Sequence, residues 1–317
     1  MFSALSILVI SFVVVWVGSG FVLRAITQIS KRWRISEFML SFFLLGIMTS
    51  LPEISIGISS ILHENPEIFV GNLLGAVIVL FLFVIPLLAI FGNGVSAPRK
   101  FQHAQMVFIL AVIAMPSLLT IDQTVSRGEA IAMIVVYFLL FLFFSVQEEI
   151  TSKLQDHSKH TGRFGFVHAL KFLFGAVLLI IGGWQIVEAT TRISQELHIA
   201  SFFVSLLLVA LGTNLPEISI IIRSVLASKK SIALGDYLGS ASANTLLFGL
   251  FSLIHGETIR LPNHILQRFF FIMIGLVLFF FFSKTKHTLS RREGLFLLGL
   301  YVCFFVGEVV LTLYLTP

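Results

Sequence analysis

The sequence predicts an all-α integral membrane protein whose ten transmembrane helices form two five-helix repeats of inverted topology. Three observations lead to this prediction: the chain is very apolar, its apolar residues form ten runs long enough to span a bilayer, and one motif occurs twice. Hydrophobic residues make up 57% of the 317 residues, and charged residues only 12%. Because a helix rises about 1.5 Å per residue, roughly 20 apolar residues cross the hydrocarbon core.

The ten apolar runs define the expected helices in chain order. Their approximate limits are 3–26, 37–62, 67–92, 102–120, 128–147, 166–190, 200–227, 231–254, 265–283 and 294–314. The first run has no basic segment before it and is long enough to span, so we expect a retained helix and not a signal peptide. The first and sixth runs each begin a half of the chain and contain glycines, and we expect these two helices to slide during transport.

Lys and Arg residues in the connections predict the orientation, because cytoplasmic loops carry an excess of both. The connections on one side hold 17 of these residues, and those on the other side hold only 4, which are Arg127, Arg192, Arg260 and Arg268. We therefore expect both termini outside and the loop between the fifth and sixth helices in the cytoplasm, in a prokaryotic-type inner (cell) membrane. The expected division is a first half (residues 1–147), a cytoplasmic linker (148–165) and a second half (166–317).

A six-residue element in the first half has a counterpart 164 residues later. Met48-Thr49-Ser50-Leu51-Pro52-Glu53 matches Gly212-Thr213-Asn214-Leu215-Pro216-Glu217. The same offset, without a gap, aligns Gly71 with Gly235, Asn72 with Asp236 and Gly75 with Gly239. Because the second copy lies on the fifth helix after the one that holds the first, the two elements run in opposite directions. Inverted repeats with broken helices are typical of secondary transporters whose ion site lies between the repeats.

Each copy places a proline and a glutamate inside an apolar helix. Proline has no N–H, and its ring clashes with the carbonyl one turn earlier, so each helix is expected to open just before Pro52 or Pro216. The carbonyls freed near Thr49 and Thr213 must face protein or a water-filled cavity, where a cation would satisfy them. An ionised carboxylate within a membrane is costly enough to indicate a functional site.

The duplicated T-x-L-P-E element, followed by G-[ND]-x-x-G, resembles the α-repeats of the cation/calcium exchanger superfamily, most closely the sodium/calcium exchanger branch. The resemblance covers residues 47–80 and 211–244. It implies a central Ca²⁺ site made by Glu53 and Glu217 with the main-chain carbonyls of Thr49 and Thr213. Such ligands suit Ca²⁺, which takes about six to eight oxygens, and two carboxylates match the charge of one divalent ion.

The sodium sites that the resemblance implies are incomplete in this chain. Ser240 stands where the family has serine, but Asn244 stands where this branch usually has aspartate. The corresponding positions in the first half are Ala76 and Leu80, which offer no ligand atom. We therefore expect a smaller number of sodium ions per cycle, or a proton as the coupling ion.

The predicted metal ligands extend beyond the central four residues. They include Ser50 and Asn214, which follow the two threonines, and Ser240, Asn244 and Asp236 on the eighth helix. Asp236 lies one helical turn before Ser240 and can face the same side.

Two further acids and the phenylalanine runs have interpretations that do not involve ion binding. For Asp236, an interfacial acid near Lys229 and Lys230 is the alternative to a ligand. Glu308 lies near the outer end of the tenth run, and we expect its side chain to snorkel to the interface. The phenylalanines at 269–271 and 279–282 are expected to face lipid.

The leading hypothesis is a secondary antiporter that exchanges Ca²⁺ for Na⁺ or H⁺ by alternating access, without a cofactor. Two alternatives stay open: an exchanger of another cation, such as Mg²⁺, Mn²⁺ or a monovalent ion, and a non-transporting homologue that binds cations. An enzyme is not expected, since the sequence has no nucleophile–base pair, phosphate loop or zinc motif. The expected partners are membrane lipid and inorganic cations. The basic residues form short clusters and no nucleic-acid-binding stripe, and no protein partner is predicted.

Overall fold

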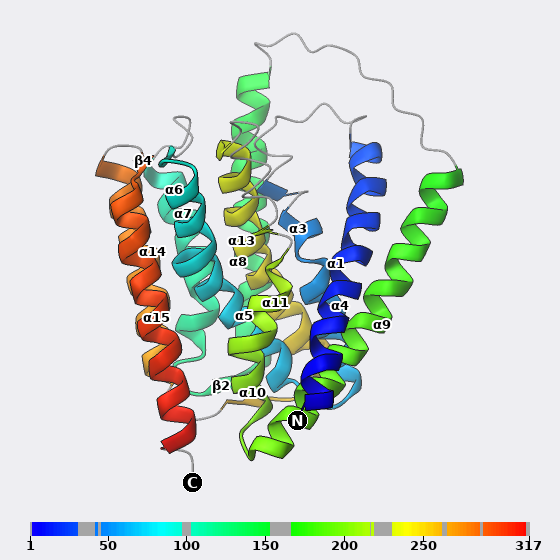
Figure 1. Cartoon of the computed structure of the whole chain (residues 1–317). Helices are drawn as coiled ribbons and strands as arrows, with labels where there is room; N and C mark the ends of the chain where they lie inside the picture. Colours follow the sequence, from blue (N-terminus) through cyan, green and yellow to red (C-terminus); the bar gives the residue numbers. More distant parts are fainter. Residues whose placement is uncertain are drawn as a thin grey trace.

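The computed structural model describes residues 2–30, 42–43, 46–96, 103–152, 166–215, 217–218, 230–261, 265–285 and 288–314. These residues form a bundle of helices that run roughly along one common direction (Figure 1). The N-terminus and the end of the last helix lie at the same end of the bundle. The prediction of a mostly helical fold is confirmed at this level.

The helices of the first half follow the predicted order. They are α1 (Phe2–Ser30), α3 (Gly46–Thr49), α4 (Leu51–Leu62), α5 (Glu67–Val79), the π-helix η2 (Leu80–Val84), α6 (Ile85–Phe91), α7 (His103–Leu119) and α8 (Arg127–Ser152). Segments α5, η2 and α6 follow one another without a break, so the third predicted helix is one long helix with a π-helical turn inside it.

The helices of the second half follow the same plan. They are α9 (Phe166–Leu197), α10 (Ser201–Val204), the π-helix η3 (Ser205–Val209), α11 (Ala210–Thr213), α13 (Lys230–His255), α14 (Ile265–Thr285) and α15 (Arg291–Tyr314). Two short antiparallel strand pairs join the halves at the ends of the bundle. They are β1 (Val95–Ser96) with β4 (Thr288–Leu289) and β2 (Thr124–Val125) with β3 (Ile259–Arg260).

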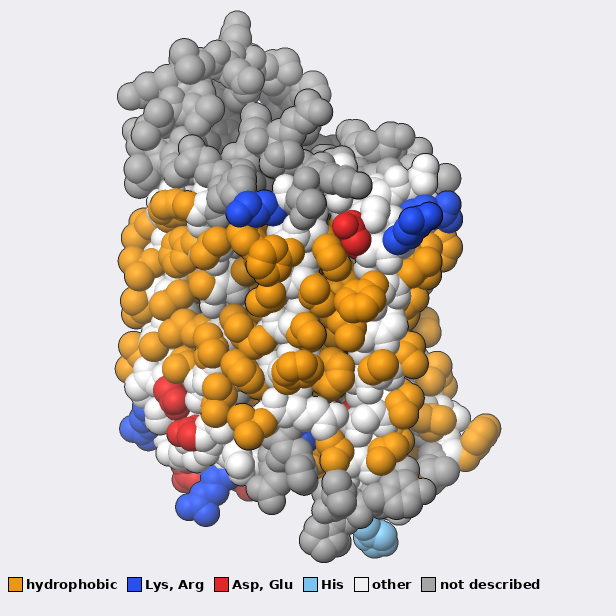
Figure 2. Space-filling view, turned by 90° about the vertical axis from the view of Figure 1, so that its left-hand side faces the viewer, with side chains coloured by type: hydrophobic (Ala, Val, Ile, Leu, Met, Phe, Trp, Pro, Cys, Tyr) orange, Lys and Arg blue, Asp and Glu red, His pale blue; other side chains and the backbone are white. Residues whose placement is uncertain are grey.

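Six helices of the described chain are long and apolar enough to cross a membrane. They are Glu67–Phe91, Arg127–Phe144, Leu170–Leu197, Ala233–His255, Leu266–Lys284 and Arg291–Thr312. Four shorter apolar helices accompany them: Phe2–Gly18, Leu51–Leu62, Ala104–Leu119 and Ser201–Thr213. Each of these segments overlaps one of the ten predicted helices. Figure 2 shows a band of hydrophobic side chains around the middle of one face, with charged side chains gathered at its two edges.

The third and eighth helices occupy the centre of the bundle. Within an 18-residue apolar stretch of each long helix, protein buries 83% of the residues in Glu67–Phe91 and 78% in Ala233–His255, compared with 28–33% in the other four. Glycines bring these central helices close to the opposite half. A Cβ atom added at Gly239 would collide with the carbonyl oxygen of Phe42, and one added at Gly75 would collide with that of Leu206. Phe42 and Leu206 are themselves 164 residues apart, so the two contacts are equivalent.

π-helical backbone precedes both copies of the motif. Residues 42–43 and 205–209 have this conformation, and they occupy matching positions at the 164-residue offset. A π-helical turn is rare and is often found at functional sites. Neither turn contains proline, and no local pattern in the sequence predicted them.

The prediction for Glu308 is wrong, because its side chain is fully buried and does not reach the interface. It forms an ion pair with Arg268 of α14, with 2.7 Å between Nη2 and Oε1. Arg268 was counted among the residues of the outer connections, but it is only 1% exposed and its guanidinium lies 4.8 Å from the ring centre of Phe202. A buried pair neutralises both charges, which explains how two ionised groups can lie inside the bundle.

The predicted lipid-facing phenylalanines are only partly so. Phe270 and Phe281 are 58% and 54% exposed, as expected. Phe279 is buried and packs edge-on against Phe81 of η2, with 5.2 Å between ring centres. A run of phenylalanines on a helix necessarily points in several directions, so some of them face the core.

Candidate cation site

The first copy of the motif interrupts a helix at the predicted place. Helix α3 ends at Thr49 and α4 begins at Leu51, with Ser50 in a turn whose φ and ψ are −79° and 10°. In the second copy α11 ends at Thr213, and Asn214 has nearly the same backbone conformation, with φ −85° and ψ 9°. Pro216 lies outside the described residues. The two copies therefore share one backbone geometry at the break.

Side chains at each break bond the carbonyl of the preceding turn. The Gly46 carbonyl accepts hydrogen bonds from the hydroxyls of Ser50, at 2.9 Å, and Thr49, at 3.2 Å. The Ala210 carbonyl accepts them from Asn214 Nδ2, at 2.7 Å, and the Thr213 hydroxyl, at 3.2 Å. The predicted ligands Thr49, Ser50, Thr213 and Asn214 are all buried here.

Each threonine is also bonded to the long central helix of the opposite half. The Thr49 hydroxyl donates to Asp236 Oδ1 on α13, and the Thr213 hydroxyl donates to Asn72 Oδ1 on α5, both at 3.2 Å. Asp236 is fully buried, so its interpretation as an interfacial acid is wrong. Asn72 was not among the predicted ligands. Its alignment with Asp236 at the 164-residue offset was the signal that could have found it.

The two glutamates lie next to these breaks and are buried. Glu217 Oε1 accepts a hydrogen bond from Ser240, at 3.3 Å, and the Ser240 hydroxyl lies 3.2 Å from that of Ser50. Tyr237 donates to the main-chain carbonyl of Glu217, at 3.0 Å. Glu53 lies beside the Thr213 side chain, and the carboxyl group of Glu217 lies near those of Glu53 and Asp236. The structure thus brings both glutamates, both threonines, Ser50, Ser240 and Asp236 into one region.

Several buried oxygens of this region have no hydrogen-bond partner among the described residues. They are Glu53 Oε2, Glu217 Oε2, Asp236 Oδ2, Asn214 Oδ1 and Asn244 Oδ1. A buried carboxylate oxygen without a donor costs free energy unless a cation or water satisfies it. Carboxylate, amide and hydroxyl oxygens are the ligands that Ca²⁺ takes in proteins. The chemistry of this region therefore fits a hard cation.

Asn244 is the predicted ligand with the least contact to the others. It is buried on α13, one turn after Ser240, and neither polar atom of its side chain has a hydrogen-bond partner in the described chain. The equivalent residues of the first half, Ala76 and Leu80, are fully buried on the central helix and contribute no oxygen. Among the described residues, no three His, Cys, Asp or Glu side chains are grouped as ligands of one metal ion.

A sequence model of the family described as "Sodium/calcium exchanger protein" matches this chain twice, over residues 3–146 and 167–310. The two matched ranges start and end 164 residues apart, which is the offset of the duplicated motif. The matches include every predicted ligand.

Several curated proteins are similar over almost the whole chain. The sodium/calcium exchanger MaX1 of Methanosarcina acetivorans is 23% identical over 95% of this chain and 97% of its own length. An uncharacterized membrane protein of Methanocaldococcus jannaschii is 23% identical over 92% of this chain and 93% of its own. The vacuolar cation/proton exchanger 1c of Oryza sativa subsp. japonica is 25% identical over 84% of this chain and 69% of its own.

Solved structures of the sodium–calcium exchanger NCX_Mj have the same fold. The structure soaked with 2.5 mM Na⁺ and 10 mM Sr²⁺ superposes with a TM-score of 0.65 at 19% identity, over 96% of this chain and 98% of that one. A structure soaked with zero Na⁺ and Ca²⁺ gives 0.64 at 20% identity.

Proposed function

The chain belongs to the sodium/calcium exchanger protein family, and from this premise we propose that it exchanges Ca²⁺ for Na⁺ or H⁺ across the membrane by alternating access. Because the members of this family are transporters, the chain is a membrane cation exchanger. The observation that carries the choice of Ca²⁺ is the pair of buried glutamates at two equivalent helix breaks, each with an unpartnered oxygen. Two carboxylates balance the charge of one divalent ion.

The proposed Ca²⁺ ligands are Glu53, Glu217, Thr49 and Thr213. The flanking positions, where other cations bind, are Ser50, Asn214, Ser240, Asn244 and Asp236. The breaks support this assignment, because a broken helix near mid-membrane is tolerated only where its backbone faces protein or a cavity. The transported ions are the only ligands in this proposal, and no cofactor takes part.

The proposed topology has ten spans in two inverted halves (residues 1–147 and 166–317), joined by a cytoplasmic linker (148–165). Two observations support it. The N-terminus and the end of α15 lie at the same end of the bundle (Figure 1), as an even number of spans requires. The family also matches each half separately, with equal spacing. The excess of Lys and Arg in one set of connections puts both termini outside.

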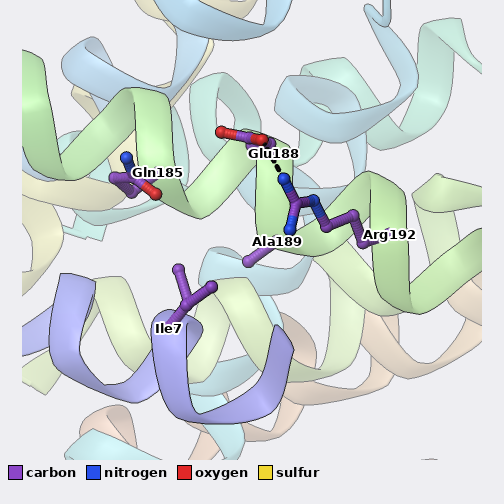
Figure 3. A pocket seen from close by; sticks show the side chains of 5 residues that line it. All are labelled: Ile7, Gln185, Glu188, Ala189 and Arg192. Atoms are coloured by element: carbon purple, nitrogen blue, oxygen red, sulfur yellow. Dashed lines mark hydrogen bonds and ion pairs between the residues drawn. The ribbon is translucent and has the colours of Figure 1, made fainter. Parts of the chain in front are cut away.

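Helices α1 and α9 are the elements that slide between the inward-open and outward-open states in this proposal. They pack chiefly against each other. A surface cavity of about 190 Å³ lies beside their contact, lined by Ile7, Gln185, Glu188, Ala189 and Arg192. Figure 3 shows Ile7 of α1 facing α9 across this space, where Glu188 and Arg192 form an ion pair on one helix.

The coupling ion is the second point of the proposal. Sodium/calcium exchange is supported by the similarity to MaX1, and cation/proton exchange by the similarity to the rice exchanger. The buried Ala76 and Leu80 favour a smaller role for sodium, because the first half has no oxygen where the second has those of Ser240 and Asn244.

The test is uptake of radioactive Ca²⁺ into proteoliposomes under a sodium gradient or a proton gradient, each imposed alone. We expect uptake that is driven by one or both gradients and that is lost in Glu53→Gln. If neither gradient drives Ca²⁺ uptake but the purified protein binds Ca²⁺, the protein is a non-transporting homologue. Uptake of Mg²⁺ or Mn²⁺ in place of Ca²⁺ would overturn the assignment of the substrate.

A further inference from the structure

Ser55 belongs to the repeated motif but not to the proposed set of ligands. The match between the two copies extends to Ile54-Ser55-Ile56 and Ile218-Ser219-Ile220. Ser55 lies on α4 two residues after Glu53 and is only 7% exposed, and its hydroxyl donates a hydrogen bond to the main-chain carbonyl of Leu179 on α9. Because an α-helix has 3.6 residues per turn, Ser55 and Glu53 point to nearly opposite sides of α4. The serine therefore connects the helix of Glu53 to α9.

Gly183 gives the serine hydroxyl access to this carbonyl. In an α-helix the carbonyl of one residue bonds the N–H of the residue four positions later, which for Leu179 is Gly183. A Cβ atom added at Gly183 would collide with the side chain of Ser55 and would lie 3.0 Å from its main-chain carbonyl carbon. The missing side chain thus leaves a notch on α9, in which Ser55 is seated.

The contact between α4 and α9 continues to the end of α4. The ring of His63, the residue after α4, packs on that of Trp184 with 4.0 Å between ring centres. At about 1.5 Å per residue, Ser55 and His63 are about 12 Å apart along the helix. Helix α9 therefore contacts α4 from the neighbourhood of Glu53 to the end of the helix.

The equivalent positions on α1 have different residues. At the 164-residue offset Gly183 corresponds to Ser19 and Trp184 to Gly20, so α1 has a side chain where α9 has the notch. Ser219, the equivalent of Ser55, lies outside the described residues. A contact that is made in only one position of a sliding helix stabilises that position relative to the other. The contact of Ser55 with α9 is therefore a source of bias between the two positions.

We propose that Ser55 is a positioning residue of the transport cycle, because its hydrogen bond to Leu179 holds α9 against the helix of Glu53 and so favours one of the two access states. We call this contact of Ser55 with Leu179 and Gly183 the latch. The inference rests on the proposed function, since it assumes that α9 slides relative to α4. When the latch opens, the Leu179 carbonyl keeps its bond to the Gly183 N–H, so no buried acceptor is left unsatisfied.

The first experiment measures the position of α9 directly. Nitroxide labels are attached at Leu197→Cys, at the end of α9, and at Val310→Cys, near the end of α15, in a Cys303→Ser background. Both labelled positions are exposed, and α9 and α15 lie on opposite sides of the bundle (Figure 1). Pulsed electron paramagnetic resonance gives the distances between the two labels and the population of each distance.

We expect two distances in the parent protein. Ser55→Ala is expected to lower the population that matches this structure, relative to the other, by about 3-fold or more, the effect of an average hydrogen bond between membrane helices. Ser60→Ala is the matched control, because Ser60 is also buried on α4 but bonds the Gly57 carbonyl of its own helix, at 2.9 Å. Gly183→Ala fills the notch and is expected to shift the populations in the same direction as Ser55→Ala.

The second experiment measures the half-saturating Ca²⁺ concentration for exchange from each side of oriented proteoliposomes. The apparent affinity on one side scales with the population of the state that is open to that side. Ser55→Ala is therefore expected to move the two half-saturating concentrations in opposite directions and to change their ratio by about 3-fold or more. A purely structural role of Ser55 would lower the amount of active protein and leave this ratio unchanged.

Three results would overturn the proposal. They are unchanged populations in Ser55→Ala, an equal shift in Ser60→Ala, and half-saturating concentrations that move in the same direction on both sides. A single distance in the parent protein, with and without Ca²⁺, would also overturn it, because α9 would then not slide. If Ser55→Ala shifts the populations but the parent protein transports no Ca²⁺, the latch is confirmed and the proposed transport function is wrong.

Discussion

The two helix breaks at the candidate cation site have the same backbone but different chemistry. Ser50 and Asn214 have almost identical φ and ψ, and both threonines bond to the opposite half at 3.2 Å. The breaks are bonded to different side chains, since Asp236 and Ser240 of α13 contact the first and Asn72 of α5 contacts the second. At the position equivalent to Ser240, α5 has Ala76. The two copies thus share the backbone of the break and differ in the charge and in the oxygen atoms placed beside it.

A second difference between the halves is the presence of a buried ion pair in only one of them. In the second half Arg268 and Glu308 form their buried pair beside Phe202. The positions 164 residues earlier are Ala104 and Phe144, and Phe144 stacks on Phe42 with 5.6 Å between ring centres. One half therefore uses an ion pair where the other uses aromatic packing.

The largest expected effect is on Ca²⁺ transport, at the two glutamates, which occupy equivalent positions in the two halves. Glu53→Gln and Glu217→Gln are each expected to lower Ca²⁺ transport by about 100-fold or more, because each removes half the charge that balances the ion, and loss of a buried charge partner costs about 3 to 5 kcal/mol. Ca²⁺ flux into proteoliposomes measures the loss, with Glu257→Gln in an exposed turn as the control. Losses that differ strongly between the two glutamates would contradict an equivalent role.

The next effect is on stability, at the ion pair that only the second half has. Glu308→Gln leaves Arg268 buried without its counter-charge, so we expect the free energy of unfolding to fall by about 3 to 5 kcal/mol. Transport per folded molecule should change little, because the pair lies outside the proposed ligand set. Thermal unfolding of the purified protein and Ca²⁺ flux separate the two effects.

The double variant Arg268→Met with Glu308→Leu is the control for this prediction. Replacing both partners with apolar residues of similar size is often neutral, so the double variant is expected to regain most of the lost stability. A double variant as unstable as Glu308→Gln would mean that the pair has a role beyond mutual neutralisation.

Substitution of Gly75 and Gly239 tests how closely each central helix must approach the backbone of the opposite half. Gly239→Ala and Gly75→Ala place a methyl group against a backbone carbonyl of the opposite half, and such overpacking costs about 1 to 3 kcal/mol. Gly299→Ala is the matched control, because a Cβ there meets nothing within 4 Å. The unfolding temperature should fall in both core variants and not in the control. Equal temperatures in all three would show that the central helices can move apart at little cost.

The smallest expected effect sharpens the comparison between α5 and α13. Ala76→Ser with Leu80→Asn gives the first half the oxygens of the second, and we expect a steeper dependence of Ca²⁺ flux on sodium concentration. Because Leu80 is buried, Ala76→Ser alone serves as the milder variant. A roughly third-power sodium dependence already present in the parent protein would contradict the expectation, since backbone carbonyls or water would then replace the missing ligands.

The apolar runs, the helix break before Pro52 and the buried positions of Glu53 and Glu217 follow from the sequence. Long apolar runs have few alternatives to a membrane helix, and proline in such a helix removes a hydrogen bond in a known place. The burial of Asp236 and Glu308 could not be predicted from apolar runs or from proline. Both lie on helices that are apolar on most sides, so periodicity does not indicate which face is turned inward.

The partners of these two acids are also distant in the sequence. Asp236 contacts Thr49, 187 residues away, and Glu308 contacts Arg268, 40 residues away on the preceding helix. A single acid near the end of an apolar run has the same local pattern whether it faces the interface or the core. Asn72 and the π-helical turns were missed for a related reason, because their significance depends on what the opposite half places beside them.

The pairing of each threonine with the opposite half also has a consequence for how the protein is made. Asp236 is synthesised 187 residues after Thr49, and Thr213 is synthesised 141 residues after Asn72. At about 5 to 20 residues per second, Asn72 waits for Thr213 for roughly 7 to 30 s. The first half thus enters the bilayer before the second half supplies this hydrogen bond, so maturation depends on how promptly the second half follows from the ribosome.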